Sequence, residues 1–250
     1  MTTKDAGVLN YINANKLVSI GQLTENLGMS ESTVRRALGR LSQAQKIVRF
    51  HGGASAVSEA ALCSPLYARF DRCSKEKEAI ARKAASMVPY GSNIIMLGGT
   101  TVAGMCKHIT NRGLTVITNS LLVLDQLKQD RRTKVVLLGG EYDPDEAEMN
   151  GTLTINSLQY LAADCLFTSA AAFDDERGFL TSRMNAINFY KQCYAASQKV
   201  FMLIDASKYR RQDIAVIARY DDVDYMICDD ALPQEARDGI AQKGVSLVIP

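Results

Sequence analysis

Histidine is scarce in this chain of 250 residues, which contains only His51 and His108. Histidine is the usual general base of a Ser-His-Asp triad and a frequent ligand of zinc. Neither histidine completes such a triad or a cluster of metal ligands. The sequence therefore predicts no catalytic residues, no metal site and no cofactor, and it indicates a protein that is not an enzyme.

Cysteine pairs, a signal peptide and long apolar runs are also missing. The six cysteines are scattered without a C-x-x-C pair, which is typical of reduced thiols in a cytosolic protein. Residues 1–10 lack the basic start and apolar core of a signal peptide, and no apolar run approaches the roughly 20 residues that a membrane span needs. We therefore expect a cytoplasmic protein without membrane contact.

Charge is unevenly spread along the chain. The composition is that of an ordinary globular protein, 47% hydrophobic and 22% charged, with a formal net charge of only +2. Between residues 35 and 51, however, no acid accompanies the basic residues Arg35, Arg36, Arg40, Lys46 and Arg49. Charge alone leaves two readings open, a solvated helix face or a surface for nucleic acid.

The N-terminal pattern predicts a winged helix-turn-helix. Hydrophobic residues at helical spacing predict three helices, at 8–15, 19–27 and 31–45. Gly28 ends the second helix, and the third has a buried stripe of Val34, Leu38 and Leu41. The opposite face of the third helix carries arginines and hydroxyls, which is what a helix that reads the major groove requires.

A hairpin wing follows the third helix. Residues 46–50 alternate like a strand and Gly52-Gly53 supplies a turn, which brings Arg49 and His51 within reach of phosphates or the minor groove. The residues expected to contact double-stranded operator DNA are Ser30, Ser32, Thr33, Arg35, Arg36, Arg40, Arg49 and His51.

Beyond this region, short hydrophobic strands alternate with helix-length segments. A helix is predicted over 75–88, and strands at 94–97, 114–117, 135–138, 165–167, 200–204, 225–228 and 245–249. This pattern is typical of an α/β fold with a mainly parallel sheet that is covered on both faces. The predicted organisation is a DNA-binding domain at 1–58, a linker at 59–73, and an α/β domain for effector binding and oligomerisation at 74–250.

Glycine-rich and polar segments follow several of these strands, at the edge where open α/β sheets bind ligands. Each segment alone is also explained by helix capping or by a turn, but their recurrence favours a binding site. Bare backbone N–H groups, hydroxyls and a lysine suit a phosphate. The residues predicted to bind the effector are Gly98, Gly99, Thr100, Thr101, Thr118, Asn119, Ser120, Gly139, Gly140 and Lys208.

These segments resemble the DeoR family of bacterial sugar-metabolism regulators over essentially the whole chain. The more specific likeness is N-terminal, at 23–30, 33–36 and 48–54, and the distal likeness includes 99–101, 118–121, 138–140 and 205–209. The resemblance implies a sensor domain similar to sugar-phosphate isomerases such as ribose-5-phosphate isomerase. It also implies phosphorylated sugars as effectors.

The chain departs from the family pattern at several positions that usually hold acidic, polar or glycine residues. These positions are Ala37, Leu97, Ala171, Ala172, Ala186 and Asn188. Because of the departures at the sensor, an isomerase-like acid or base is harder to find here than in a true enzyme.

The sequence thus predicts a homo-oligomeric DNA-binding transcriptional regulator, a dimer or a tetramer. It is expected to repress a carbohydrate-utilisation operon under the control of a phosphorylated sugar or a related metabolite. Two alternatives stay open: a sugar-phosphate isomerase-like enzyme with an N-terminal interaction module, and a regulator whose degenerate sensor serves only oligomerisation. Stabilisation by a ligand would separate a working sensor from a degenerate one.

Overall fold

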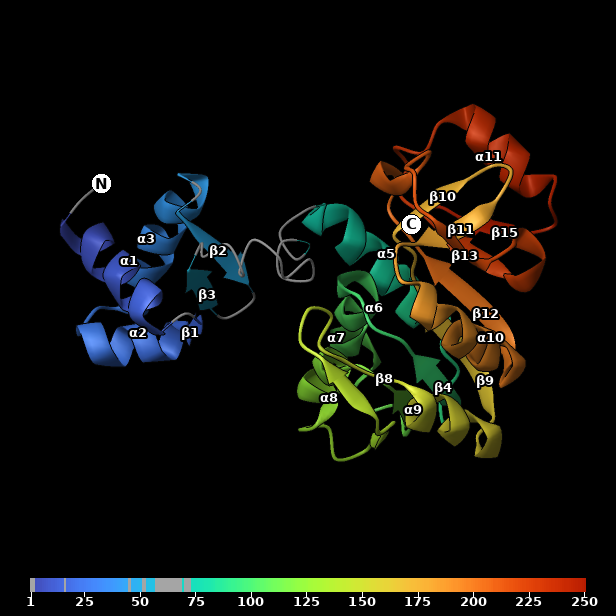
Figure 1. The fold of residues 1–250 in the computed structure, drawn as a ribbon, viewed down its shortest axis with the longest axis horizontal. Coiled ribbons are helices and arrows are strands. Elements are labelled where there is room, and N and C mark those ends of the chain that lie inside the picture. Colours follow the sequence, from blue (N-terminus) through green and yellow to red (C-terminus); the bar gives the residue numbers. More distant parts are fainter. Residues whose placement is uncertain (1–2, 16, 45, 51–52, 57–68, 70–72) are drawn as a thin grey trace. The chain divides into compact units, whose positions relative to one another are not determined.

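The computed structural model describes residues 3–15, 17–44, 46–50, 53–56, 69 and 73–250. The chain divides into two compact units, Met1–Arg72 and Cys73–Pro250 (Figure 1). The sequence-based linker, 59–73, lies outside the described residues except for positions 69 and 73.

The first unit combines three helices with a small antiparallel sheet. Its elements are α1 (Thr3–Asn15), β1 (Leu17–Ser19), α2 (Ile20–Leu27), α3 (Glu31–Gln43), β2 (Ile47–Phe50) and β3 (Gly53–Ala56). The strands lie in the order β1-β3-β2, and β3 pairs with both of its neighbours. This arrangement confirms the predicted winged helix-turn-helix.

One apolar core holds these helices and strands together. Its fully buried members come from every helix and include Val8, Ile12, Leu23, Val34 and Leu38. They recur every three or four positions, because that spacing keeps side chains on one side of a helix. Helix α1 begins at Thr3 rather than at residue 8, and α3 ends at Gln43 rather than at residue 45, since polar terminal turns carry no hydrophobic signal.

Seven strands form the central sheet of the second unit in the order β15-β14-β12-β9-β4-β5-β6, and every neighbouring pair is parallel. The strands are β4 (Asn93–Met96), β5 (Thr115–Thr118), β6 (Lys134–Leu137), β9 (Ala163–Thr168), β12 (Ser197–Leu203), β14 (Tyr225–Ile227) and β15 (Ser246–Val248). Each strand overlaps a predicted apolar run, so the mainly parallel α/β fold is confirmed. The sheet grows from β4 in both directions, and such a switch point is where open α/β sheets bind ligands.

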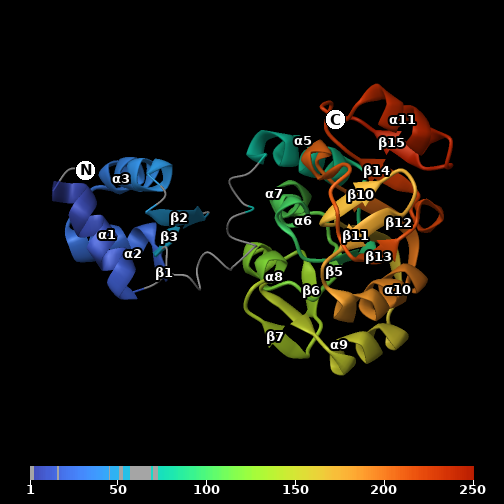
Figure 2. The ribbon, with the colours of Figure 1, turned by 45° about the horizontal axis from the view of Figure 1, so that its top comes forward.

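Helices cover both faces of this sheet (Figures 1 and 2). One face packs against α5 (Ser74–Ser86), α6 (Thr100–Gly104), α7 (Cys106–Ile109) and α8 (Leu121–Leu127). The other packs against α9 (Thr152–Ser157), α10 (Ile187–Ala195) and α11 (Gln234–Ala241). Along β4, Ile94 and Met96 contact the first layer and Ile95 the second, as the alternation of a strand requires. None of the described helices combines the length and the apolar composition that crossing a membrane requires.

Two small antiparallel elements accompany the main sheet, and the hydrophobic pattern did not predict either of them. β7 (Glu141–Asp143) and β8 (Glu148–Asn150) form a ribbon. β10 (Ala172–Asp174), β11 (Gly178–Thr181) and β13 (Ala215–Ala218) form a three-stranded sheet. β7, β8 and β10 have three residues each and include acidic side chains, so they present no apolar run.

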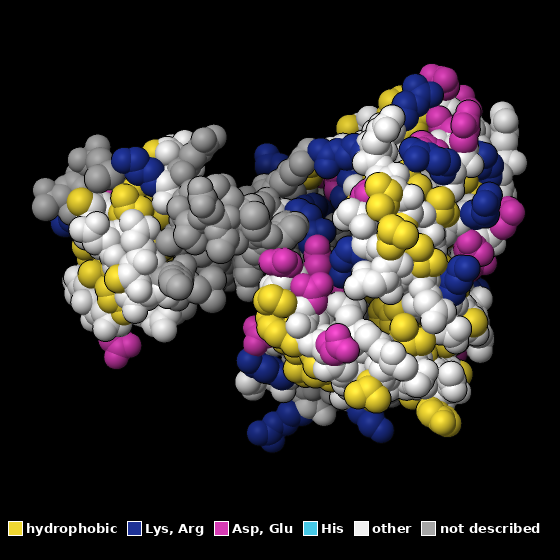
Figure 3. All heavy atoms as spheres, in the orientation of Figure 1, with side chains coloured by type: hydrophobic (Ala, Val, Ile, Leu, Met, Phe, Trp, Pro, Cys, Tyr) yellow, Lys and Arg dark blue, Asp and Glu magenta, His cyan; other side chains and the backbone are white. Residues whose placement is uncertain are grey.

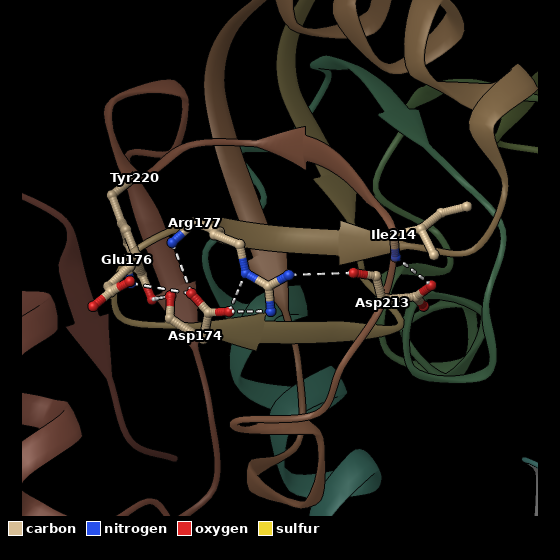
Figure 4. Close-up of polar contacts among 6 residues, drawn as sticks. All are labelled: Asp174, Glu176, Arg177, Asp213, Ile214 and Tyr220. Carbon is tan, nitrogen blue, oxygen red and sulfur yellow. Dashed lines mark hydrogen bonds and ion pairs between the residues drawn. The ribbon is translucent and has the colours of Figure 1, made fainter.

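Asp174 closes the turn between β10 and β11 (Figure 4). Its carboxylate accepts hydrogen bonds from the backbone N–H groups of Glu176 and Arg177 and from the Arg177 guanidinium at 2.7 Å. Arg177 also donates to the Asp213 carbonyl at 3.4 Å, which links the turn to the segment before β13. Burial alone would raise the pKa of Asp174, but these donors hold it below its ordinary value.

Candidate functional site

The outer face of α3 gathers hydroxyls and arginines. Ser32, Arg35 and Arg36 are exposed, whereas the apolar stripe of the same helix is buried. Just before the helix, the Ser30 hydroxyl lies 2.9 Å from the Thr33 hydroxyl and 3.2 Å from that of Ser32. A helix with donors and cations on its exposed face can present them to base edges and phosphates.

Arg35 and Arg36 are held by local contacts within α3. Arg35 pairs with Glu31 at 2.6 Å, and both side chains of this pair are more than half exposed. Arg36 donates to the Ser32 carbonyl at 3.2 Å. Exposed pairs of this kind contribute little to stability, so both guanidinium groups can exchange these contacts for DNA at small cost.

Arg40 differs from the other predicted DNA contacts because it binds a buried acid. Its guanidinium nitrogens lie 2.6 and 3.2 Å from the Asp5 carboxylate, and the Asp5 side chain is 2% exposed. The hydrogen bond to Asp5 raises the pKa of Arg40 above its ordinary value. This pair ties α3 to α1, a role that the sequence did not predict. A DNA contact by the half-exposed Arg40 side chain stays a prediction.

The wing is present as the hairpin of β2 and β3, in which the backbone of Arg49 pairs with that of Ala54. His51 lies outside the described residues. The DNA contacts of Arg49 and His51 therefore stay predictions.

The surface of the second unit offers no block of positive charge on the face shown in Figure 3. Basic and acidic side chains are interspersed there with hydrophobic ones. Mixed charge of this kind produces little long-range attraction for DNA.

In the second unit, adjacent strand ends bring several predicted effector residues together. The carboxyl ends of β12, β9, β4 and β5 lie side by side and lead to Lys208, Ser169, Gly98 and Asn119. The Lys208 ammonium donates to the Ser169 hydroxyl at 3.3 Å. A Cβ at Gly99 would lie 3.9 Å from the Cβ of Ser169, so the lysine and the glycine loop are neighbours.

The glycine loop is shaped by Gly99, whose φ of +115° lies in the region that favours glycine. Gly98, Gly99 and Thr100 are all partly exposed. Thr101 is only 2% exposed. The accessible part of the loop is therefore 98–100.

The loop after β5 is mostly committed to the fold. Thr118 and Ser120 are fully buried, and the Thr118 hydroxyl accepts a hydrogen bond from the Ser120 backbone at 3.0 Å. The Asn119 carbonyl accepts the backbone N–H of Met149 at 2.8 Å, which joins this loop to β8. Of the three predicted effector residues here, Asn119 lines a depression and the other two do not.

Gly139 and Gly140 are engaged by a neighbouring side chain and by neighbouring backbone. The Thr154 hydroxyl donates to the Gly139 carbonyl at 2.8 Å. A Cβ at Gly140 would come within 2.3 Å of the Asn150 carbonyl oxygen, so only glycine fits this close approach. Packing accounts for Gly140, and effector contacts of both glycines stay predictions.

Two charged residues that the sequence reasoning missed lie beside Gly98. Glu148 of β8 is 4% exposed, and its carboxylate pairs with the Arg183 guanidinium at 2.9 Å. A Cβ at Gly98 would lie 1.6 Å from Glu148 Oε1, so this carboxylate rests against the backbone of the glycine loop. Burial alone would lower the pKa of Arg183, but the Glu148 charge raises it above its ordinary value. No local motif could have revealed residues that lie 35 positions apart.

A depression is lined by Gly98, Glu148, Arg183, Asn119 and Tyr190, together with Asn150 and neighbouring apolar residues. Asn119 donates to the Met149 carbonyl at 3.1 Å, but its Oδ1 is buried without a hydrogen-bond partner. Burial raises the pKa of Tyr190 to about 12, so the phenol stays protonated. An unpaired acceptor beside a buried ion pair is suited to a polar ligand.

Both units match known protein families. Residues 5–60 match the DeoR-like helix-turn-helix domain, and residues 72–230 match the DeoR C-terminal sensor domain. This chain belongs to the DeoR family. The DeoR-family transcriptional repressor AccR of Agrobacterium fabrum is 30% identical to it, over 90% of this chain and 88% of AccR. The glycerol-3-phosphate regulon repressor of Escherichia coli is 26% identical, over 93% of this chain and 92% of its own length.

Among solved structures, the chain is similar to ribose 5-phosphate isomerase A of Neisseria gonorrhoeae. The two are 18% identical with a TM-score of 0.40, and the match covers 54% of this chain and 53% of the isomerase. The relatives named above are transcriptional regulators. The DeoR-family resemblance seen in the sequence is thus confirmed, and the chain is a DNA-binding transcriptional regulator with a sensor domain.

In this DeoR-family chain, the charged side chains beside the glycine loop come from two segments that the sequence analysis did not single out. Leu97 and Ala186, two of the positions at which the sequence departs from the pattern expected from the resemblance, are both buried and belong to the apolar core. The charge beside the glycine loop is supplied by Glu148 from β8 and by Arg183 from the segment before α10. The site is therefore polar despite the departures.

Proposed function

We propose that this DeoR-family regulator is a repressor of a carbohydrate-utilisation operon that a phosphorylated sugar or a related metabolite releases from its operator. The observation that carries the proposal is the position of the 98–100 loop beside Lys208, at the carboxyl ends of adjacent parallel strands. Backbone N–H groups and an ammonium suit a phosphate, and the place is where such sheets bind ligands. The names of the relatives AccR and glycerol-3-phosphate regulon repressor support repression and a phosphorylated effector.

The proposal assigns DNA reading to α3 and the wing. The exposed Ser32, Arg35 and Arg36 are its proposed base and phosphate contacts. A homo-oligomer would place two such helices on the two halves of a symmetric operator, because half-site spacing mirrors the symmetry of the protein.

The test measures DNA and metabolite binding on the same protein. Operator sequences are first selected by the full chain from a random DNA pool, and their affinity is then measured with sugar phosphates and with the same sugars lacking phosphate. We expect the phosphorylated compounds to weaken DNA binding. They should also raise the melting temperature by about 5–10 °C at a hundredfold excess over Kd, because a ligand of the native state stabilises it by mass action. A broad panel of phosphates that changes neither quantity would favour a degenerate sensor that serves only oligomerisation.

A pair of variants at Gly99 tests the location of the phosphate site. Gly99→Asp adds a negative charge where the phosphate is proposed to lie, so it should abolish the response to phosphorylated compounds and leave DNA binding intact. Gly99→Ala imposes the same backbone strain at φ +115° without the charge, and it should keep part of the response. Equal responses in the two variants would place the phosphate elsewhere.

A further inference from the structure

The Glu148 carboxylate occupies space beside the glycine loop that a ligand would need. It rests against Gly98, pairs with Arg183 at 2.9 Å, and is nearly excluded from solvent. The depression around it leaves essentially no space that a water molecule could enter, whereas ligand pockets usually have about 300–1,000 Å³. A ligand that enters this depression must therefore displace the Glu148 side chain.

Displacement of Glu148 is costly unless the ligand replaces its charge. The Arg183 side chain is only 23% exposed. Removing one partner of a buried ion pair is strongly unfavourable, because it leaves the other charge unpaired. A neutral hydroxyl would leave the guanidinium without its anion. A ligand carboxylate would restore the ion pair, because a guanidinium can donate two parallel N–H···O hydrogen bonds to a carboxylate. The displaced Glu148 carboxylate would meanwhile become hydrated.

Asn119 indicates a second feature of the ligand. Its Oδ1 is a buried acceptor without a partner in the same depression, and a buried polar atom of this kind is normally satisfied by a donor. A ligand hydroxyl next to the carboxylate would supply that donor.

We infer that the effector is a phosphorylated hydroxy acid, whose carboxylate replaces that of Glu148 on Arg183 and whose hydroxyl binds Asn119. The inference rests on the proposed phosphate site at the 98–100 loop and adds the chemistry of the opposite end of the ligand. In the absence of effector, Glu148 acts as an internal anion that keeps Arg183 paired.

The test compares phosphate esters that differ only in the group meant for Arg183. 3-Phosphoglycerate and glycerol 3-phosphate form one such pair, and 6-phosphogluconate and glucitol 6-phosphate form a longer one. Binding to the full chain is measured by calorimetry and by the shift in melting temperature. We expect the acid of the better-fitting pair to bind at least about tenfold more tightly than its alcohol, which is the scale of one charge-assisted contact.

Two variants separate this role from a purely structural one. Glu148→Gln keeps the shape of the side chain but competes less for Arg183, so it should tighten binding of the acid and leave the alcohol nearly unchanged. The double variant Glu148→Gln with Arg183→Gln contains no unpaired buried charge, and it should bind acid and alcohol equally. Equal binding of acid and alcohol by the wild type, or an acid preference that survives in the double variant, would overturn the inference while leaving phosphate control intact. If none of the four esters binds, the inference and the proposed phosphate site both fail.

Discussion

Arg36 and Arg40 lie about one turn apart on α3 but have different partners. Arg36 donates to a carbonyl of its own helix, whereas Arg40 binds the buried Asp5 of α1. Substitutions at these two positions can therefore distinguish loss of DNA contacts from loss of stability.

Arg36→Ala should weaken operator binding without changing the melting temperature. If Arg36 contacts a base, the loss of binding free energy should be about 1–3 kcal/mol. If it contacts a phosphate, the affinity should depend less steeply on salt concentration. Fluorescence anisotropy over a range of salt concentrations measures both. An unchanged affinity and an unchanged salt slope, also with Arg35→Ala added, would place the reading surface elsewhere.

Arg40→Ala should lower the melting temperature of the DNA-binding unit, because it removes the cation that pairs with the buried Asp5 carboxylate. Calorimetry on Arg40→Ala and Arg36→Ala compares the two positions directly. Equal melting temperatures in these variants would show that the Asp5 pair contributes nothing to stability.

At the scale of the elements, the turn between β10 and β11 depends on one carboxylate. Asp174→Ala removes an acceptor that receives two backbone N–H groups and the Arg177 guanidinium, and should cost about 1–3 kcal/mol of unfolding free energy at neutral pH. Since folding lowers the pKa of Asp174, its contribution is present above the ordinary aspartate value and is lost as the pH falls through the lower folded value.

Urea unfolding at several pH values measures this contribution. The stability difference between wild type and Asp174→Ala should shrink on acidification. Glu176→Ala in the same turn is the control, because the structure shows Glu176 as exposed and uses its backbone N–H in this turn. A difference that does not change with pH would mean that the charge of Asp174 is unimportant.

Elements with long apolar runs were predictable from the sequence, and short or isolated features were not. All seven strands of the parallel sheet coincide with hydrophobic runs, because helices cover both faces of the sheet, although the edge strands β6 and β15 are only partly buried. β8 has three residues and carries Glu148, whose partner Arg183 lies far along the chain. Local patterns identify glycine loops and helix faces, but they do not show which side chains meet through tertiary packing.

At the scale of the whole molecule, each unit has a hydrophobic core of its own. The core around Val8 and Leu38 belongs to the first unit, and the two layers around the parallel sheet belong to the second. We therefore expect a fragment of residues 73–250 to fold independently and to oligomerise.

Calorimetry and analytical ultracentrifugation of this fragment check the expectation. The fragment should melt cooperatively, and phosphorylated ligands should raise its melting temperature as much as they raise that of the same unit in the full chain. An unfolded fragment, or a full-length protein that is strictly monomeric, would contradict this division of roles.

The pairing of β4 with β9 has a consequence for synthesis of the protein. Ile94 lies opposite Cys165, so the centre of the parallel sheet cannot form until residues far beyond β4 have left the ribosome. The described core residues of the first unit all lie within the first 56 positions, and N-terminal domains generally fold first during translation. A nascent chain therefore has a folded DNA-reading surface before it has a sensor. Translation that stops between the two units would release a fragment that retains this surface and that no effector can control.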